Sequence, residues 1–241
     1  MSNTLTIALK EIRSYLTSPM AYVVTGIFLV LTGIFFTAYL AATGYTDTSI
    51  RGYLEPPINT IWVLLFAAVL TMRLIAEEKK IGTWELLLTA PVRDVEVILG
   101  KFLGSLAIYV AMLALTLYYP ILLIILGDPD LGPIGTSYLG LFLLGSASLA
   151  VGIFASSLTS NQIVSAVVAG GILGLLWVVG YLAQLVPAGG LKDILEYISL
   201  SFHFPDFVRG VVDTRAIVYY LSVTALFLFL AIRSLESSRW S

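Results

Sequence analysis

The sequence predicts an all-α integral membrane protein with six transmembrane helices. Of its 241 residues, 59% are hydrophobic and only 12% are charged, whereas a soluble domain averages about 45–50% apolar and about 25% charged. Charge-free apolar runs recur along the chain, and several reach the roughly 20 residues that a helix needs to cross a bilayer. A soluble core of this size could not bury so much apolar surface, so lipid must cover most of it.

The limits of the charge-free runs predict the individual spans, because a charge at the bilayer centre is costly. Arg73 falls near the end of the second span, where its long side chain can reach the headgroups. A polar break from Ser156 to Gln162 divides the longest run into two spans. The predicted spans are residues 20–43, 57–76, 102–126, 138–156, 163–186 and 216–234.

The N-terminal residues 4–17 predict a separate amphipathic helix. Apolar side chains recur there at helical spacing, at Leu5, Leu9, Ile12 and Leu16. Such a helix is typical of the membrane interface, here on the cytoplasmic side. The alternative is a plain extension of the first span, but Ser18-Pro19 interrupts the path and favours the interfacial helix.

The segment 187–215, before the last span, is too long for a simple turn. Ile194, Tyr197 and Ile198 indicate one amphipathic helix, and Pro205-Asp206 indicates the start of a second. Asp213 or Thr214 can cap the sixth span. We therefore expect short helices that dip into the outer leaflet.

The distribution of Lys and Arg predicts that both termini are cytoplasmic, because basic residues accumulate on the inner side. The proposed outer segments hold four basic residues, and the inner segments hold the remaining nine. The outer ones are Arg51, Lys192, Arg209 and Arg215; the inner ones are Lys10, Arg13, Arg73, Lys79, Lys80, Arg93, Lys101, Arg233 and Arg239.

The most strongly charged part of the chain is the cytoplasmic segment 77–96, between the second and third spans. Gly82 is expected to end the helix that leaves the membrane. Thr83 can cap a new short helix, with Glu85 in its first turn and Pro91 closing it. This helix carries Leu86, Leu87 and Leu88. These exposed leucines need either the bilayer surface or a protein partner to cover them.

This segment resembles the signature of type-2 ABC exporter permeases: an acidic-basic cluster, Gly-Thr, a glutamate, leucines and a proline, just after the second span. The interfacial helix, six spans and outer helical segment agree with that family. The strings Ser18-Pro19, 152–159, Asn161-Gln162-Ile163 and 209–215 are similar to those of gliding-motility and nitrous-oxide-reductase-maturation permeases.

The resemblance implies a single permease domain that moves a substrate across the bacterial or archaeal plasma membrane. Two permeases, copies or paralogues, would pair, and each would dock on a cytoplasmic ABC ATPase that binds ATP and Mg²⁺. The short helix of segment 77–96 would be the coupling helix, which transmits closure of the ATPase to the spans. The permease itself would carry no catalytic, cofactor, metal or nucleic-acid site, and it lacks a Gly-x-x-x-x-Gly-Lys-Ser/Thr loop. Membrane lipid is the remaining partner. The residues implied at the ATPase interface are Glu77, Glu78, Lys79, Gly82, Thr83, Glu85, Leu86, Leu87 and Pro91.

Two small-xxx-small pairs, Gly100 with Gly104 and Gly170 with Gly174, fit close helix contacts. Because glycine is common in membrane helices, general packing is favoured over a dedicated dimer seam for each pair. Pro120 predicts a kink in the third span. The neighbouring Tyr118 and Tyr119 are typical of an interfacial aromatic belt.

Two other functional classes are open. A secondary transporter or channel usually carries ionisable residues inside its spans, but the middles of the predicted spans are uncharged, which favours energy from a partner and an amphiphilic or lipid-linked substrate. An intramembrane enzyme is suggested by Glu77-Glu78. However, no arginine follows that pair shortly afterwards, and the only histidine, His203, lies in the outer segment.

Overall fold

The computed structural model describes residues 3–44, 49–54, 57–83 and 92–238, and every regular element within them is a helix. Six helical stretches are long and apolar enough to cross a membrane, which confirms the predicted all-α architecture. The helices are α1 (Asn3–Thr17), α2 (Pro19–Ala42), α3 (Ile50–Leu54), α4 (Pro57–Thr71), α5 (Ala76–Ile81), α7 (Asp94–Thr116), α8 (Tyr118–Leu126), α9 (Leu131–Ser157), α10 (Gln162–Ala183), α11 (Gly190–Ile198), α12 (Phe204–Val208) and α13 (Thr214–Ser238).

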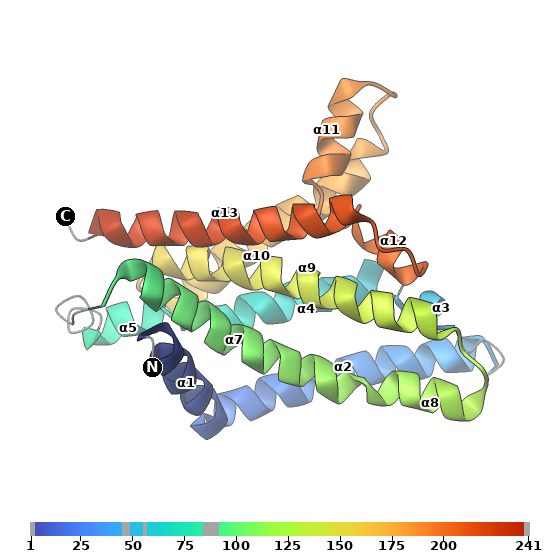
Figure 1. The fold of residues 1–241 in the computed structure, drawn as a ribbon, viewed down its shortest axis with the longest axis horizontal. Helices are drawn as coiled ribbons and strands as arrows, with labels where there is room; N and C mark the ends of the chain where they lie inside the picture. Colours follow the sequence, from blue (N-terminus) through green and yellow to red (C-terminus); the bar gives the residue numbers. More distant parts are fainter. Residues whose placement is uncertain (1–2, 45–48, 55–56, 84–91, 239–241) are drawn as a thin grey trace.

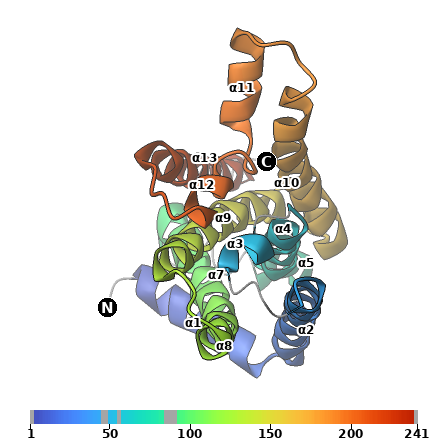
Figure 2. The same ribbon diagram turned by 90° about the vertical axis from the view of Figure 1, so that its right-hand side faces the viewer.

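The long helices run side by side, with both ends of the chain and α5 at one end of the bundle and α3 and α12 at the other (Figure 1). Crossings by all six candidate spans of the described residues would place both termini on the same side of the membrane. Helix α9 lies at the centre (Figure 2), where it packs against α13, α4, α10, α12, α7 and α3. It is the most buried of the six candidate spans.

Helix α1 is separate from α2 and crosses the direction of the long helices (Figure 1). Ser18 between them has extended backbone, with φ −87° and ψ 123°, so the continuous-helix alternative is wrong. The face that packs on the bundle carries Ala8, Glu11 and Tyr15. The predicted apolar stripe is not that face, because Leu5, Leu9 and Leu16 stay about half exposed. They are free to meet lipid, as an interfacial helix requires.

The helix of the third candidate span begins at Asp94 and extends beyond the predicted span 102–126 at its N-terminal end. A helix rising 1.5 Å per residue from Asp94 to Leu126 is about 50 Å long, longer than the roughly 30 Å hydrocarbon core. Its first turns therefore extend past the bilayer. Residues 94–96 of the predicted cytoplasmic segment and Lys101 lie inside this helix.

The same span breaks at Leu117, between α7 and α8, close to the predicted kink. Pro120 has no N–H to donate to the carbonyl of Thr116, four residues earlier. The Tyr138 hydroxyl of α9 donates to that carbonyl instead, at 2.8 Å. The belt prediction is wrong for Tyr119, which is buried in the core, while Tyr118 is exposed.

The predicted short helices before the last span are α11 and α12, which are separated by residues 199–203. Helix α11 projects sideways from the bundle (Figures 1 and 2). The intervening His203 stacks on Tyr219 of α13, with 4.2 Å between ring centroids. Its Nε2 lies 3.1 Å from the Tyr197 carbonyl. Burial lowers the pKa of His203, so the ring is a neutral packing group at pH 7.

Candidate coupling site

The helix that leaves the membrane ends where the sequence predicts. Gly82 caps α5 in the left-handed conformation, with φ +76°, which glycine adopts without the steric cost that a Cβ imposes. Glu77, Glu78 and Lys79 lie on α5, and Thr83 follows the cap. The other predicted interface residues, Glu85, Leu86, Leu87 and Pro91, lie outside the described residues.

A buried ion triad joins α5 to α1 and α7. The ammonium of Lys101 lies 2.9 Å from a carboxylate oxygen of Glu11 and 2.9 Å from one of Glu78. The Lys101 side chain is 1% exposed. Because a buried charge without a partner is strongly destabilising, the three side chains hold their helices together. Lys10 reaches Glu78 from the exposed side, at 3.2 Å.

Arg73, near the end of the second span, contacts α1. Its guanidinium carbon lies 4.3 Å from the centre of the Tyr15 ring, and its Nη1 donates to the Ser18 hydroxyl at 3.0 Å. The Tyr15 hydroxyl in turn donates to the Leu70 carbonyl. Burial raises the pKa of Tyr15 above its ordinary value, so this hydroxyl keeps its proton. These contacts attach the start of the first span to the end of α4.

Two residues of the predicted ATPase interface, Glu78 and Lys79, have partners on other helices of this chain. Lys79 Nζ donates to the carbonyl of Ser157, the last residue of α9, at 2.5 Å. An ammonium at a helix C-terminus is favourable, because the unpaired carbonyls there carry partial negative charge. The triad and this bond connect α5 to α1, α7 and α9 at once.

An open polar cleft of about 470 Å³ lies between α1 and α5. Glu77 and Thr83 from the predicted interface line it, together with hydroxyl and charged side chains of α1. The cleft thus brings the start of the predicted coupling segment next to the N-terminal helix, a juxtaposition that the sequence did not reveal. Its described lining residues are Lys10, Glu11, Ser14, Thr17, Ser18, Arg73, Leu74, Glu77, Glu78, Ile81 and Thr83.

The two glycine pairs have different environments. A Cβ on Gly100 would lie 2.7 Å from Cβ of Ile7, and one on Gly104 would lie 2.6 Å from Cβ of Glu11. The first pair therefore forms the close seam between α7 and α1. A Cβ on Gly170 or Gly174 would meet nothing within 4 Å. These two line an apolar groove of about 270 Å³ between α4 and α10.

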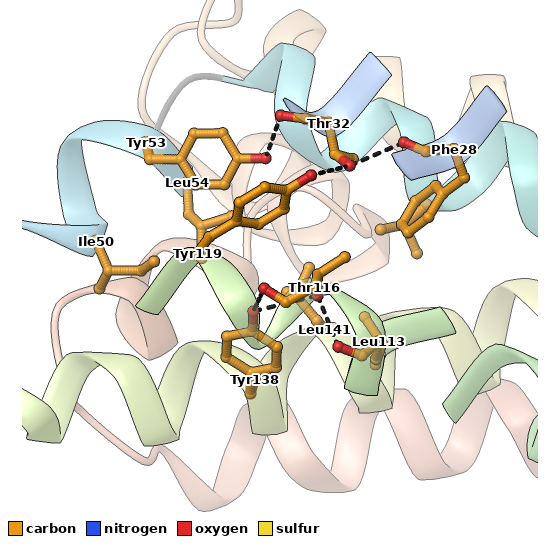
Figure 3. A pocket seen from close by; sticks show the side chains of 11 residues that line it. Phe28, Thr32, Ile50, Tyr53, Leu54, Leu113, Thr116, Tyr119, Tyr138 and Leu141 are labelled. Carbon is orange, nitrogen blue, oxygen red and sulfur yellow. Dashed lines mark hydrogen bonds between the residues drawn. The ribbon is translucent and has the colours of Figure 1, made fainter. Parts of the chain in front are cut away.

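A hydrogen-bonded cluster of hydroxyls (Figure 3) lies beside α3, at the end of the bundle opposite α5 (Figure 1). The hydroxyls of Thr32 and Tyr119 lie 2.8 Å apart, and the Tyr53 hydroxyl donates to the Thr32 carbonyl at 3.2 Å. Tyr138 and Thr116 add further hydroxyls to a small cavity of about 30 Å³, whose remaining lining is apolar. Tyr53 belongs to α3. The sequence does not predict this helix, because five residues are too few for a clear periodicity.

The fold and the charged region around α5 define a multi-pass, all-helical membrane protein whose second candidate span ends in a charged helix that is anchored to several other helices. A family model described as "ABC-2 family transporter protein" matches residues 39–233, and the chain belongs to that family. This membership places it among transport proteins rather than enzymes. The match includes the segment 77–96 and begins beyond α1.

Two curated relatives give the same result. The chain is 28% identical over 182 residues to a protein described as "Probable multidrug ABC transporter permease YbhS" from Escherichia coli K12. It matches the protein of the same description from Escherichia coli O157:H7 to the same extent. Each alignment covers 73% of this chain and 47% of the relative, so the chain spans about half the length of these relatives.

Proposed function

We propose that this chain is the permease subunit of an ATP-driven exporter, and that a separate cytoplasmic ATPase docks on segment 77–96. The observation that carries the proposal is the end of α5. Two of its charged residues, Glu78 and Lys79, are anchored to three other helices, and beyond Gly82 the chain enters the leucine-rich signature of the family. A rigid attachment of this kind is what a helix end needs to transmit force into the bundle.

The polar cleft between α1 and α5 is the proposed docking surface. Glu77 and Lys10 offer charges of both signs at its edge, and complementary charges at an interface rim favour correct register and fast association more than raw affinity. ATP and Mg²⁺ belong to the partner, since this chain has no phosphate-binding loop of the Gly-x-x-x-x-Gly-Lys-Ser/Thr kind.

A second permease copy is proposed to pack on the groove between α4 and α10. The open glycines there permit close approach of another helix, and α10 is the least buried of the candidate spans. The described lining of the groove carries no charge. A pathway between two such uncharged faces would suit an amphiphilic or lipid-linked substrate better than a small ion.

The plasma membrane of a bacterium or archaeon is the proposed location, with both termini and α5 on the cytoplasmic side. The excess of Lys and Arg at the end of the bundle that holds the termini supports this orientation.

The proposal is tested by co-purification of an ATP-hydrolysing subunit with the tagged permease. Leu87→Asp places a charge on the proposed coupling helix and should abolish recovery of the ATPase, because the loss of a central interface anchor costs about 2 kcal/mol or more. Glu85→Lys should weaken recovery less, since it changes a helix-dipole interaction of about 0.3–1 kcal/mol and its ion pairs.

The matched control is Leu191→Asp, an equally drastic change at a leucine that is 60% exposed on α11, on the opposite side of the bundle. It should leave ATPase recovery unchanged. If Leu87→Asp retains wild-type recovery and stimulated hydrolysis while a thermal-shift assay shows it folded, the coupling assignment is wrong.

A further inference from the structure

The second span contains a break that no proline or glycine explains. Helix α4 ends at Thr71 and α5 begins at Ala76, with turn conformation between them. The intervening residues are Met72, Arg73, Leu74 and Ile75, all of which are good or acceptable helix formers. A side chain inserted into the backbone hydrogen-bond ladder is the remaining common cause of such a break.

That side chain is Ser156 of α9, which is fully buried. Its hydroxyl accepts hydrogen bonds from the backbone N–H of Ile75 at 3.1 Å and of Ala76 at 3.0 Å. It also donates to the Met72 carbonyl at 3.2 Å. A serine hydroxyl has one donor and two acceptor positions, so all three are used on the broken ladder. The break thereby avoids the cost of unpaired backbone groups inside a membrane protein.

The backbone of α9 also lies close to a side chain of α4, one turn earlier on the same face of α9. A Cβ on Gly152 would lie 1.9 Å from the Thr71 hydroxyl oxygen, so only glycine allows α4 to come this near. Because residues four apart share a helix face, Gly152 and Ser156 together form a socket for the break. The bond from Lys79 to the Ser157 carbonyl adds a tie just beyond it.

Helix α9 also contacts the break between α7 and α8. At its outer end Tyr138 donates to the Thr116 carbonyl that Pro120 leaves free. Tyr138 and Ser156 are separated by about 27 Å along a continuous helix, at 1.5 Å per residue. One continuous, buried helix, α9, therefore bonds to the α4–α5 break near one end of the molecule and to the α7–α8 break near the other.

We infer that Ser156 is a positioning residue that makes the α4–α5 break a working joint, through which movement of α5 is transmitted along α9 to the outer joint at Tyr138. The inference rests on the proposed function, since the ATPase is the source of the movement. It adds the internal route by which the cytoplasmic end is linked to the outer cavity.

The joint itself is tested on the permease alone. In Ser156→Ala the amides of Ile75 and Ala76 lose their acceptor, so hydrogen exchange in a peptide covering 72–80 should accelerate about tenfold. Alternatively, the ladder closes and α5 moves. Spin labels at Lys80→Cys and Leu158→Cys report that movement as a shifted or broadened distance distribution, on a chain without native cysteine.

The matched control is Ser157→Ala. Ser157 is also buried at the end of α9, but among the described residues its hydroxyl bonds to the Phe154 carbonyl of its own helix and not to α4 or α5. Exchange and distances should stay as in the unmodified protein, and Ser156→Thr, which keeps the hydroxyl, should restore most of the original behaviour. If Ser156→Ala matches Ser157→Ala in both measurements, Ser156 does not hold the joint.

Transmission is tested in the complex with the co-purified ATPase. Spin labels at Ile34→Cys on α2 and Ile125→Cys on α8 report the outer joint, and both native side chains are exposed. Trapping the ATPase with ADP and vanadate should shift this distance in the otherwise unmodified permease and in Ser157→Ala, but not in Ser156→Ala, although Ser156→Ala still binds an ATPase that hydrolyses ATP.

An unaltered response in Ser156→Ala, or no response in the parent protein, would overturn the transmission route. Failure to recover any ATPase would instead count against the proposed function, and the measurements on the isolated permease would still decide whether Ser156 holds the joint.

Discussion

At the scale of single residues, the buried Lys101 triad shows how charges are kept in a lipid-facing protein. The Glu11 side chain is 9% exposed and that of Glu78 is 16% exposed, so neither carboxylate is fully hydrated. The favourable interaction is their shared contact with one ammonium. Such a pair is not a strong net source of stability, but removing one member leaves the others uncompensated.

Replacing Lys101 with Met should therefore lower stability by about 3–5 kcal/mol. Glu11 loses the cation that it contacts, while Glu78 retains Lys10. Thermal unfolding in detergent measures the effect. The control is Lys80→Met, at an exposed lysine of the same α5 region, which should change stability by about 0.5 kcal/mol or less. Adding Glu11→Gln and Glu78→Gln to Lys101→Met should recover part of the loss; no recovery would show that charge compensation is not the cause.

At the scale of helices, the glycine seam determines where α1 lies. The backbone of α7 comes close enough to α1 that side chains would collide, because a Cβ on Gly100 would also lie 2.9 Å from the Thr4 carbonyl oxygen. The seam places Glu11 beside Lys101 and Tyr15 beside Arg73. The same small-xxx-small pattern in α10 has no partner helix against it among the described residues.

Gly100→Leu should destabilise the protein by about 1–3 kcal/mol through overpacking against α1, whereas Gly170→Leu should leave the stability of the single chain unchanged. Thermal unfolding distinguishes them. In a pairing assay such as cross-linking in membranes, the order should reverse, with Gly170→Leu reducing contact between two copies. Equal destabilisation by both substitutions would contradict the assignment of one pair to the interior and the other to an open groove.

At the scale of the whole molecule, α1, α5 and the C-terminus lie at one end of the bundle, and six crossings would place all three on the same side of the membrane. The orientation prediction follows from the electrostatics of the segments at the two ends. Lys80→Cys should react with a membrane-impermeant thiol reagent only after the cells are opened, whereas Leu191→Cys on α11 should react in intact cells. The absence of native cysteine removes background labelling. Labelling of position 80 in intact cells would reverse the assigned orientation.

The sequence by itself indicated that lipid surrounds most of the protein. It also predicted the number of candidate spans, the separate N-terminal helix and the end of α5 at Gly82. These features depend on local properties: the apolar length that a bilayer requires, the backbone restriction before Pro19, and the left-handed cap that glycine favours. The helix of the third span begins before the predicted span, at Asp94, and it can include Lys101 because residues distant in the sequence neutralise that charge.

Only the tertiary structure decided which polar residues meet. Glu78 and Glu11 share one cation although they lie on different helices. Tyr119 is buried and not in the expected aromatic belt, because Thr32 provides a buried hydrogen-bond partner for its hydroxyl. The α4–α5 break cannot be read from its own residues, since its cause is a hydroxyl on another helix. Local sequence sets where a helix forms and stops, but an inserted side chain acts only after packing has brought α9 against α4.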